Sequence, residues 1–217
     1  MIIVVACNKG GAGKSTSVCN LAVAITRAQP GAEVCLVDAD AQRSACNWHA
    51  EREAAGLEPR ITLLEKRDNI STALKTLAGK FDYVLVDVAG RNSRELITGM
   101  AAADLVVAPH QCSQLDLDTL LELREQVVRV RDLNPELRVL AYHTMASTNH
   151  AVRNKEREEF LQYLAEFPEL EVLPCSGSYR KVYRDAMAWG KSVLECDNPA
   201  AVAEVEQLLA EVLRHGR

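Results

Sequence analysis

The sequence predicts an α/β fold, a mainly parallel sheet of about seven strands with helices on both faces. Short apolar runs rich in β-branched residues recur along the 217 residues, and segments with apolar residues at helical spacing lie between them. No internal repeat or linker divides the chain. Because alternating strands and helices are joined by right-handed crossovers, they build a parallel sheet that is covered on both sides. We therefore expect a single domain over residues 1–217, with its ligand site beyond the carboxyl ends of the strands.

The predicted strands are short runs in which apolar residues follow one another instead of alternating with polar ones. IIVVAC at residues 2–7 is typical of them. A strand that helices cover on both faces is apolar on both, so such runs indicate buried strands. They occupy residues 2–7, 33–38, 60–65, 83–88, 104–109, 138–145 and 171–175.

The predicted helices lie between these runs, where apolar residues recur every three or four positions. They occupy residues 14–28, 70–78, 116–130, 156–167 and 200–213.

The last predicted helix has an apolar face and a polar side that carries glutamates. Its apolar face consists of Val202, Val205, Leu208, Leu209, Val212 and Leu213. Glu204, Glu206 and Glu211 lie elsewhere on the helix. A helix on a membrane surface usually carries a basic polar face, so we expect this one to pack on the sheet. No stretch of the chain reaches the ~18 apolar residues of a membrane span, and we expect no membrane partner.

Composition and charge restrict the class of protein further. The chain is 48% hydrophobic and 25% charged, as globular proteins are, and its formal net charge of -5 excludes a generally basic surface while allowing a local basic patch. The seven cysteines are odd in number and include no C-x-x-C pair, which argues against a disulfide framework or a zinc site. No basic segment precedes the first apolar run, so we expect no signal peptide and a cytoplasmic protein.

A glycine-rich turn, NKGGAGKST, joins the first predicted strand to the first predicted helix. Its backbone N–H groups converge at the positive end of the helix dipole, an arrangement that binds phosphate. The expected phosphate contacts are Gly10, Gly11, Ala12, Gly13, Lys14, Ser15 and Thr16. Lys14 would reach the β- and γ-phosphates, and the Ser15 hydroxyl would bind Mg²⁺. Asn8 stands where the motif G-x-x-x-x-G-K-[ST] has its first glycine.

A second lysine, Lys9, precedes Lys14 by five residues. It lies on the opposite side of the loop, where it is poorly placed to serve the same γ-phosphate. KGGAGKS resembles the deviant Walker A phosphate loop of the ParA/MinD group of dimerising ATPases. The resemblance implies that Lys9 crosses a dimer interface to the partner's phosphates and acts in catalysis with Lys14. Positive charge given in trans stabilises the transition state of phosphoryl transfer.

Two predicted strands carry an aspartate at or next to their last residue. Asp87 is the last but one residue of YVLVDV, and an aspartate in this position usually holds Mg²⁺ through a water. Asp38 and Asp40 stand in DADAQ, which resembles the family motif D-x-D-P-Q with Ala41 in place of proline. This resemblance implies that Asp40 positions the attacking water and that Asp38 lies near the metal, so that Ser15, Asp38 and Asp87 are the candidate metal residues.

The segment after Asp87 resembles the nucleotide switch of the same group. Gly90 would let the backbone move toward a γ-phosphate. Three roles stay open for Arg91: a phosphate contact, a contact with the partner subunit, or a cap on the helix that follows near Ser93.

The resemblance covers nearly the whole chain. The family pattern P-x-x-x-S-x-x-D runs here from Pro109 through Ser113 to Asp116. YRKVYRDAMAWGKSVLECD, residues 179–197, resembles the segment that closes on the adenine. In length the chain is nearest to the small, ParF-like ParA proteins. The phosphate loop begins at residue 8, which leaves no room before it for a helix-turn-helix. Specific DNA recognition would therefore come from a ParB-like or centromere-binding adaptor.

Two basic clusters indicate DNA binding without sequence preference. Their members are Arg153, Lys155, Arg157, Arg180, Lys181 and Arg184. Doubled across a nucleotide-bridged homodimer, they would form a surface that follows DNA phosphates. The alternative is that they are solvated helix faces, since several glutamates lie beside the first cluster.

Together these features predict a ParA-type ATPase that uses ATP and Mg²⁺. It would pair as a homodimer, hold nucleoid DNA and move a plasmid, chromosome or other cargo while an adaptor stimulates its slow hydrolysis. Three alternatives stay open. They are a MinD-like positioning ATPase on membranes, a small-molecule enzyme of the dethiobiotin-synthetase type, and a nucleotide-dependent scaffold that does not hydrolyse ATP.

Overall fold

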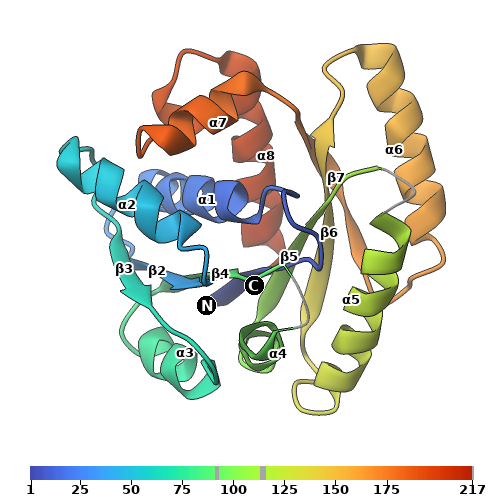
Figure 1. The fold of residues 1–217 in the computed structure, drawn as a ribbon, viewed down its shortest axis with the longest axis horizontal. Coiled ribbons are helices and arrows are strands. Elements are labelled where there is room, and N and C mark those ends of the chain that lie inside the picture. Colours follow the sequence, from blue (N-terminus) through green and yellow to red (C-terminus); the bar gives the residue numbers. More distant parts are fainter. Residues whose placement is uncertain (91–92, 113–115, 217) are drawn as a thin grey trace.

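The fold is a parallel seven-stranded sheet within the described part of the chain (Figure 1). The computed structural model describes residues 1–90, 93–112 and 116–216. The strands are β1 Ile2–Val5, β2 Val34–Ala39, β3 Thr62–Glu65, β4 Tyr83–Val88, β5 Leu105–His110, β6 Arg138–Ala146 and β7 Glu171–Ser178. All neighbouring pairs are parallel, and the order is β3-β2-β4-β1-β5-β6-β7. The predicted fold class and all seven predicted strands are confirmed.

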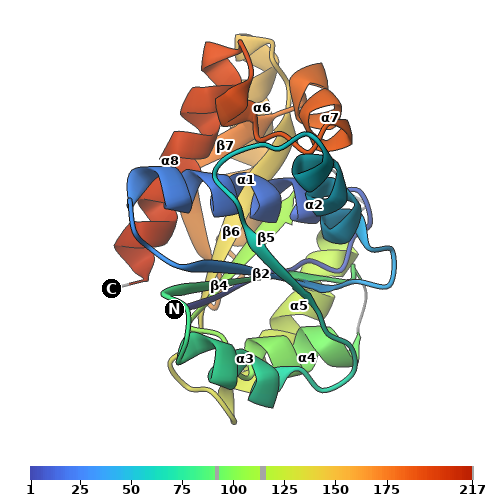
Figure 2. The ribbon, with the colours of Figure 1, turned by 90° about the vertical axis from the view of Figure 1, so that its left-hand side faces the viewer.

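The helices alternate with the strands along the chain. They are α1 Lys14–Ala28, α2 Ser44–Ala54, α3 Ser71–Ala78, α4 Arg94–Met100, α5 Asp116–Arg131, α6 His150–Leu164, α7 Lys181–Ala188 and α8 Pro199–His215, with a short 3-10 helix at Val193–Glu195. Figure 2 shows α1, α2, α7 and α8 on one side of the sheet, with α3, α4 and α5 on the other. Each side has its own hydrophobic core.

Strand β1 shows how one strand supplies both cores. Ile2 and Val4 belong to the core under α3–α6, whereas Ile3 and Val5 belong to the core under α1 and α8. All four side chains are buried. Successive side chains of a strand point to opposite faces, so an uninterrupted apolar run is what a doubly covered strand requires.

Helix boundaries and three helices differ from the sequence-based prediction. Helices α2 and α7 were not predicted, and α4 only as a helix near Ser93. In α2 the buried side chains are Ala45, Cys46, Trp48 and Arg52, so its inner face is only partly apolar. Helix α6 begins six residues earlier than predicted because the Asn149 side chain accepts hydrogen bonds from the N–H groups of Ala151 and Val152.

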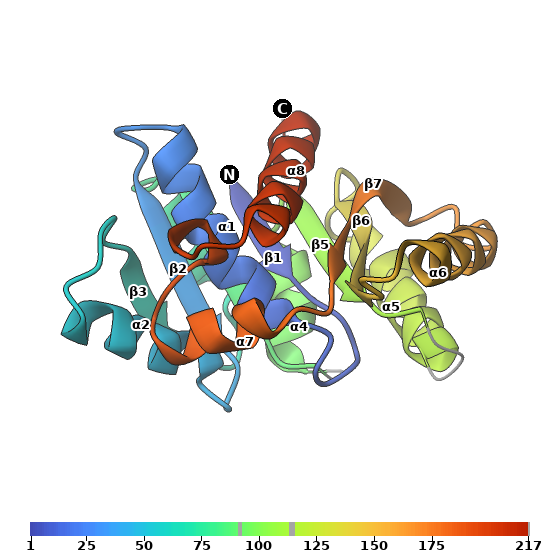
Figure 3. The ribbon, with the colours of Figure 1, turned by 90° about the horizontal axis from the view of Figure 1, so that it is seen from above.

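The position of β1 determines where a ligand can enter. Strands β4 and β5 flank β1, while the helix after β1 covers one face of the sheet and the helix after β4 covers the other (Figure 3). The loops therefore separate at the carboxyl ends of these strands, where open α/β sheets bind their ligands. Asp38 on β2 lies opposite Asp87 on β4 in the parallel register. The two aspartates predicted at strand ends are thus neighbours.

Candidate active site

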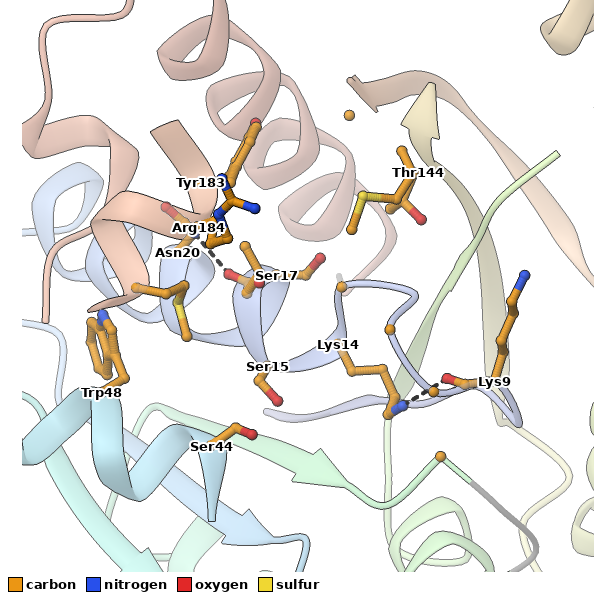
Figure 4. Close-up of a pocket in the computed structure, with 18 of the residues that line it drawn as sticks. Lys9, Lys14, Ser15, Ser17, Asn20, Ser44, Trp48, Thr144, Tyr183 and Arg184 are labelled. Carbon is orange, nitrogen blue, oxygen red and sulfur yellow. Dashed lines mark hydrogen bonds between the residues drawn. The ribbon is translucent and has the colours of Figure 1, made fainter. Parts of the chain in front are cut away.

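A cleft of about 1110 Å³ lies at the carboxyl end of the sheet. The phosphate loop and the start of α1 form its floor, while α2, α7 and the end of β6 form its walls (Figure 4). Of the predicted site residues, Lys9, Gly10, Gly11, Gly13, Lys14, Ser15, Thr16 and Asp40 line it. The predicted adenine segment also lines it, through Tyr179, Arg180, Lys181, Tyr183, Arg184, Met187 and Ala188. The cleft is large enough for a nucleotide, since ligand sites of this kind measure roughly 300–1,000 Å³.

The phosphate loop is shaped by two glycines in the left-handed region. Gly11 has φ 76° and Gly13 has φ 89°, and Gly13 directly precedes α1. Residues with a Cβ rarely adopt these angles, so glycine is needed at both positions. Ala12, between them, is buried, and its carbonyl oxygen accepts a hydrogen bond of 3.0 Å from the Thr144 hydroxyl on β6. The phosphate loop is therefore fixed by a contact with β6, a strand on the other side of β5.

Lys14 is buried under the phosphate loop. Its Nζ donates a hydrogen bond of 3.0 Å to the main-chain carbonyl of Lys9 and lies 4.0 Å from Cys7 Sγ. A Cβ built on Gly90 would lie 2.5 Å from Lys14 Nζ and 2.9 Å from the Lys9 carbonyl oxygen. The loop after β4 therefore rests directly on the phosphate loop, and only glycine fits at residue 90.

The two lysines of the loop point in different directions. In Figure 4 the Lys14 side chain turns back toward the Lys9 carbonyl, while the Lys9 side chain extends away from it. Lys9 is partly exposed and lines the cleft. The main chain of Lys9 thus contacts the Lys14 ammonium, but its side chain faces away from that site.

Asp87 is fully buried at the end of β4. Among the residues that the structure describes, neither carboxylate oxygen accepts a hydrogen bond of ordinary geometry. Burial raises the pKa of Asp87 from 3.8 to about 7; the nearby Ser15 hydroxyl opposes this rise, and the Asp38 charge adds to it. A buried carboxylate that accepts no hydrogen bond of ordinary geometry from the described residues is suited to a cation, and Ser15 beside it supplies a second oxygen.

These two oxygens fit a Mg²⁺ ion better than a metal held entirely by protein. No group of three His, Cys, Asp or Glu side chains able to hold a metal is found within residues 1–90, 93–112 and 116–216. Mg²⁺ usually keeps several waters and binds through one or two protein oxygens together with substrate phosphates. The donor set of Ser15 and Asp87 matches this pattern.

Asp38 is engaged by main-chain N–H groups. Its Oδ1 accepts a hydrogen bond of 3.0 Å from the Asp40 N–H, and its Oδ2 accepts one of 2.9 Å from the Cys46 N–H. Asp38, which lies opposite Asp87 in the sheet, therefore fixes the path of the loop that follows β2.

Asp40 lies at the start of a turn on the rim of the cleft. Its Oδ1 accepts a hydrogen bond of 2.9 Å from the Gln42 N–H, and its carbonyl oxygen accepts one of 2.9 Å from the Arg43 N–H. Aspartate is favoured as the first residue of such turns. Its second carboxylate oxygen, Oδ2, has no hydrogen bond among those identified for the described chain.

The cluster Arg180, Lys181 and Arg184 lies at the cleft and not on a separate surface. Arg180 is paired with the buried Glu204 of α8 at 3.0 Å. Lys181 and Arg184 are exposed, and Lys181 lies 3.4 Å from Asp185. Two of these three cations therefore remain available to an external ligand.

The cluster Arg153, Lys155 and Arg157 does not form one basic face. Arg157 is half-buried, donates a hydrogen bond to the Leu173 carbonyl and lies over the Phe160 ring. Lys155 is exposed and lies 3.8 Å from Glu159. Residues two apart on a helix point to different sides, so Lys155 is separated from its two neighbours in the cluster.

Some predicted residues have no described position. Arg91 and Ser113 lie outside the described residues, as does the side chain of Asp116. The three possible roles of Arg91 therefore stay predictions.

Sequence reasoning missed several residues that position the site. Asn8, at the place of the missing glycine, donates a hydrogen bond of 3.1 Å to Gln126 on α5. Arg67 binds carbonyl oxygens of the Asp38–Asp40 loop. Glu204 accepts hydrogen bonds from the start of α7. Only Asn8 had a local signal, its departure from the motif, because the other contacts join segments that are distant in the sequence.

Comparison with protein families places this site in a known group. The model of the family described as ATPase MipZ matches residues 1–159, most of the chain. The chain belongs to the MipZ ATPase family. Membership confirms the resemblance to ParA/MinD-type ATPases that the phosphate loop indicated.

Relatives of this MipZ-family chain include partition proteins. It is 29% identical over 210 residues to the maintenance of carboxysome distribution protein A of Halothiobacillus neapolitanus, covering 94% of this chain and 93% of the relative. It is 24% identical over 209 residues to the chromosome partitioning protein ParA of Myxococcus xanthus, covering 76% and 73%.

Solved structures confirm the fold. Apo McdA from Cyanothece superposes with a TM-score of 0.79 at 18% identity, covering 98% of both chains. A plasmid partition protein of Borrelia burgdorferi bound to AMPPNP gives a TM-score of 0.73 at 20% identity, covering 98% of both chains. Cobyrinic acid a,c-diamide synthase of Mycobacterium smegmatis, with an ATP analogue and magnesium, gives 0.75 at 22% identity, covering 99% and 94%. The fold is thus shared by partition proteins and by an enzyme of small-molecule synthesis.

Within the described residues, no helix is both long enough and apolar enough to cross a bilayer.

Proposed function

We propose that this chain is a ParA-type ATPase that forms an ATP-bridged homodimer, binds DNA without sequence preference and positions a cargo. An adaptor protein of the ParB-like or centromere-binding kind stimulates its hydrolysis. The observation that carries the proposal is the divergence of the two loop lysines: Lys14 is buried under its own phosphate loop, while the Lys9 side chain points away from that site. A cation directed away from the Lys14 ammonium suits a phosphate held by a second copy.

The residues of one chain divide the work on the nucleotide. The N–H groups of Gly10–Thr16 would hold the phosphates, and the Lys14 ammonium, which donates to the Lys9 carbonyl, would bind the γ-phosphate in its place. Ser15 and Asp87 would hold Mg²⁺, Asp87 through a water, with Asp38 nearby, and the bound ion would supply positive charge against the phosphates.

Asp40 orients the attacking water, since it lies on the cleft rim with one carboxylate oxygen engaged in its turn. Lys9 of the partner chain then adds positive charge at the transferred phosphoryl group. Each site is incomplete in a monomer, so turnover is slow until two chains pair and the adaptor binds.

The exposed cations of α7, Lys181 and Arg184, are the best-placed DNA contacts of the two predicted clusters. Tyr179 and Trp189, which are 65% and 69% exposed, flank them. Because this segment also lines the nucleotide cleft, DNA binding there depends on the bound nucleotide. In the ATP state we expect the protein on the nucleoid in the cytoplasm.

The relatives support partition over small-molecule synthesis. Proteins named for carboxysome distribution and for chromosome partitioning match most of the chain. The likeness to cobyrinic acid a,c-diamide synthase concerns the fold, and such an enzyme has no use for a cation that points away from its own site.

Substitution of each loop lysine tests the proposal. We expect Lys14→Ala to abolish ATP binding, and Lys9→Ala to bind ATP within about threefold of wild type while losing about 10²-fold in turnover. Lys75→Ala, which changes an exposed lysine of α3, is the matched control and should change neither. Equilibrium binding of a fluorescent ATP analogue and steady-state phosphate release give the two readouts.

A mixing experiment decides whether Lys9 acts in trans. The Lys9→Ala and Asp40→Ala variants are each inactive alone, but a mixed dimer contains one site with an intact Asp40 and a Lys9 from the partner. An equimolar mixture should recover about a quarter of wild-type turnover, since about half of its two-fold symmetric dimers are mixed and each has one complete site. No recovery, together with a monomeric ATP-bound protein, would contradict the trans-acting Lys9.

A further inference from the structure

The Asp40 loop connects β2 to α2 and has few contacts of its own. Its internal hydrogen bonds join the Asp38 carboxylate to the Asp40 N–H, and Asp40 to the N–H groups of Gln42 and Arg43. Ala41 is the second residue of this turn, where proline would fix the backbone angle, and alanine does not. The loop therefore needs another element to hold Asp40 in one place.

Arg67, just after β3, binds this loop from outside. Its Nη1 donates hydrogen bonds of 2.5 Å to the Asp38 carbonyl and 3.0 Å to the Lys66 carbonyl, and its Nη2 donates one of 2.8 Å to the Asp40 carbonyl. The same guanidinium lies 3.8 Å from Asp38 Oδ1. One side chain thus joins the two aspartates of the loop to the adjacent strand.

Glu65 forms ion pairs with both Arg67 and Arg43. Glu65, at the end of β3, accepts hydrogen bonds of 3.0 and 2.5 Å from Arg43 and lies 3.7 Å from Arg67 Nη2. Arg43 ends the Asp40 turn in the left-handed region, at φ 56°. Glu65 therefore joins the far end of the turn to the arginine that holds its beginning.

The position of Arg67 separates it from the nucleotide contacts. Asp40 and Gln42 line the cleft, but Arg67 does not. Its identified hydrogen bonds go to main-chain carbonyls. Any effect of Arg67 on hydrolysis must therefore pass through the loop it holds.

We propose that Arg67 is a positioning residue, whose guanidinium fork fixes the main chain on both sides of Asp40 so that its carboxylate meets the attacking water. The inference rests on the proposed function for its catalytic consequence. Its structural part, a fixed Asp40 loop, stands independently of hydrolysis. A lysine would not replace it, because an ammonium group cannot span two carbonyls as a planar fork does.

Three variants and a control test this role. Arg67→Gln and Arg67→Lys remove the fork, the latter keeping the charge, and Arg60→Gln removes a 91% exposed arginine side chain that is paired with Glu58. We expect both Arg67 variants to lose about 10- to 10²-fold in kcat with ATP affinity within about threefold of wild type, since small misplacements of catalytic groups have costs of this size. The control should match wild type. In an Arg67→Gln background, Ala41→Pro should restore kcat several-fold by fixing the turn through its backbone angle.

Hydrogen–deuterium exchange gives a readout that needs no activity. Without nucleotide, amides of residues 39–43 should exchange at least about tenfold faster in Arg67→Gln than in wild type, while amides of the strands stay unchanged. Wild-type kcat in either Arg67 variant, or a fall in ATP affinity as large as the fall in kcat, would overturn the positioning role. A protein that does not hydrolyse ATP would contradict the proposed function but not the fixed Asp40 loop. Unchanged exchange of the loop in Arg67→Gln would overturn the positioning role in either case.

Discussion

At the scale of single residues, the site contains groups whose arrangement costs stability. Asp87 is buried without ordinary hydrogen bonds among the described residues, and its pKa is raised to about 7. Burial penalises the ionised form of Asp87. The folded chain is therefore destabilised most at the pH where Asp87 is ionised, which is also where it can bind a cation. Binding of Mg²⁺ and nucleotide, which would neutralise this carboxylate, should therefore raise the free energy of unfolding.

Because burying the ionised Asp87 carboxylate lowers the free energy of unfolding, replacing Asp87 should raise that free energy in a pH-dependent way. In the unfolded chain Asp87 loses its proton near pH 4, whereas the folded chain holds it until about pH 7, so its contribution falls as pH rises between these values. Asp87→Asn should therefore be more stable than wild type at pH 8, by on the order of 1–4 kcal/mol, with little difference at pH 4. Urea unfolding without nucleotide and Mg²⁺ measures this difference.

The exposed Asp197→Asn variant is the control and should not change with pH in this way. Asp87→Asn should at the same time lose Mg²⁺-dependent ATP binding. A variant less stable than wild type at pH 8 would show that the carboxylate has partners in the folded chain and that the cation site is wrongly assigned.

At the scale of elements, α8 does more than cover the sheet. The predicted packing of its apolar face is confirmed, with Val205, Leu208, Leu209 and Val212 buried in one core. Glu204 was predicted to lie away from this packing, and that is wrong. It is buried, because it accepts hydrogen bonds from the Ser178 N–H at 3.2 Å, Arg180 Nε at 3.0 Å and the Tyr183 hydroxyl at 2.9 Å. Helix α8 therefore holds the start of α7 against the cleft.

This cluster predicts that α8 controls α7. Glu204→Ala should lower the free energy of unfolding by about 2 kcal/mol, because it removes the carboxylate that pairs with Arg180 and accepts from the Ser178 N–H, and leaves the Tyr183 hydroxyl only its longer bond to the Ala201 carbonyl. It should also weaken ATP binding, since α7 lines the cleft. Chemical denaturation and ATP titration measure the two effects.

The matched control is Glu206→Ala, which removes an exposed glutamate two residues further along the same helix. It should change neither quantity measurably. Equal effects of the two variants would mean that helix α8, and not the contact with α7, accounts for the loss.

At the scale of the whole molecule, the cleft brings together segments from both ends of the chain. The phosphate loop follows β1, while the exposed Lys181 and Arg184 belong to α7, and both segments line the same cleft. A nucleotide in the cleft would therefore lie next to these two cations. The cations of α6 are more dispersed, since Arg157 is bonded to the Leu173 carbonyl.

This arrangement predicts nucleotide-dependent, salt-sensitive DNA binding. With saturating ATP, DNA retention should fall steeply with salt, and the double variant Lys181→Gln/Arg184→Gln should reduce the slope of log affinity against log salt by roughly 2 per chain. Fluorescence anisotropy with duplexes of unrelated sequence measures the slope. ATP affinity of the same variant must be determined in parallel because both residues line the cleft.

The exposed pair Lys75→Gln/Lys80→Gln, on and just after α3, is the control of equal charge change and should leave the slope unaltered. Equal retention in ADP and ATP would contradict the coupling of the cleft to DNA binding.

The sequence by itself determined the fold class, the seven strands and the phosphate loop, because each depends on a local pattern. The patterns are apolar runs, helical spacing, and the glycines of the loop, of which Gly11 and Gly13 adopt a positive φ. It also indicated the strand-end aspartates. Only the tertiary structure decided which residues meet. The pairing of Asp38 with Asp87, the contacts of Arg67 with the Asp40 loop and the burial of Glu204 all follow from the order of strands and the packing of helices. These contacts join segments distant in the chain, and no local periodicity encodes which distant segment a side chain will reach.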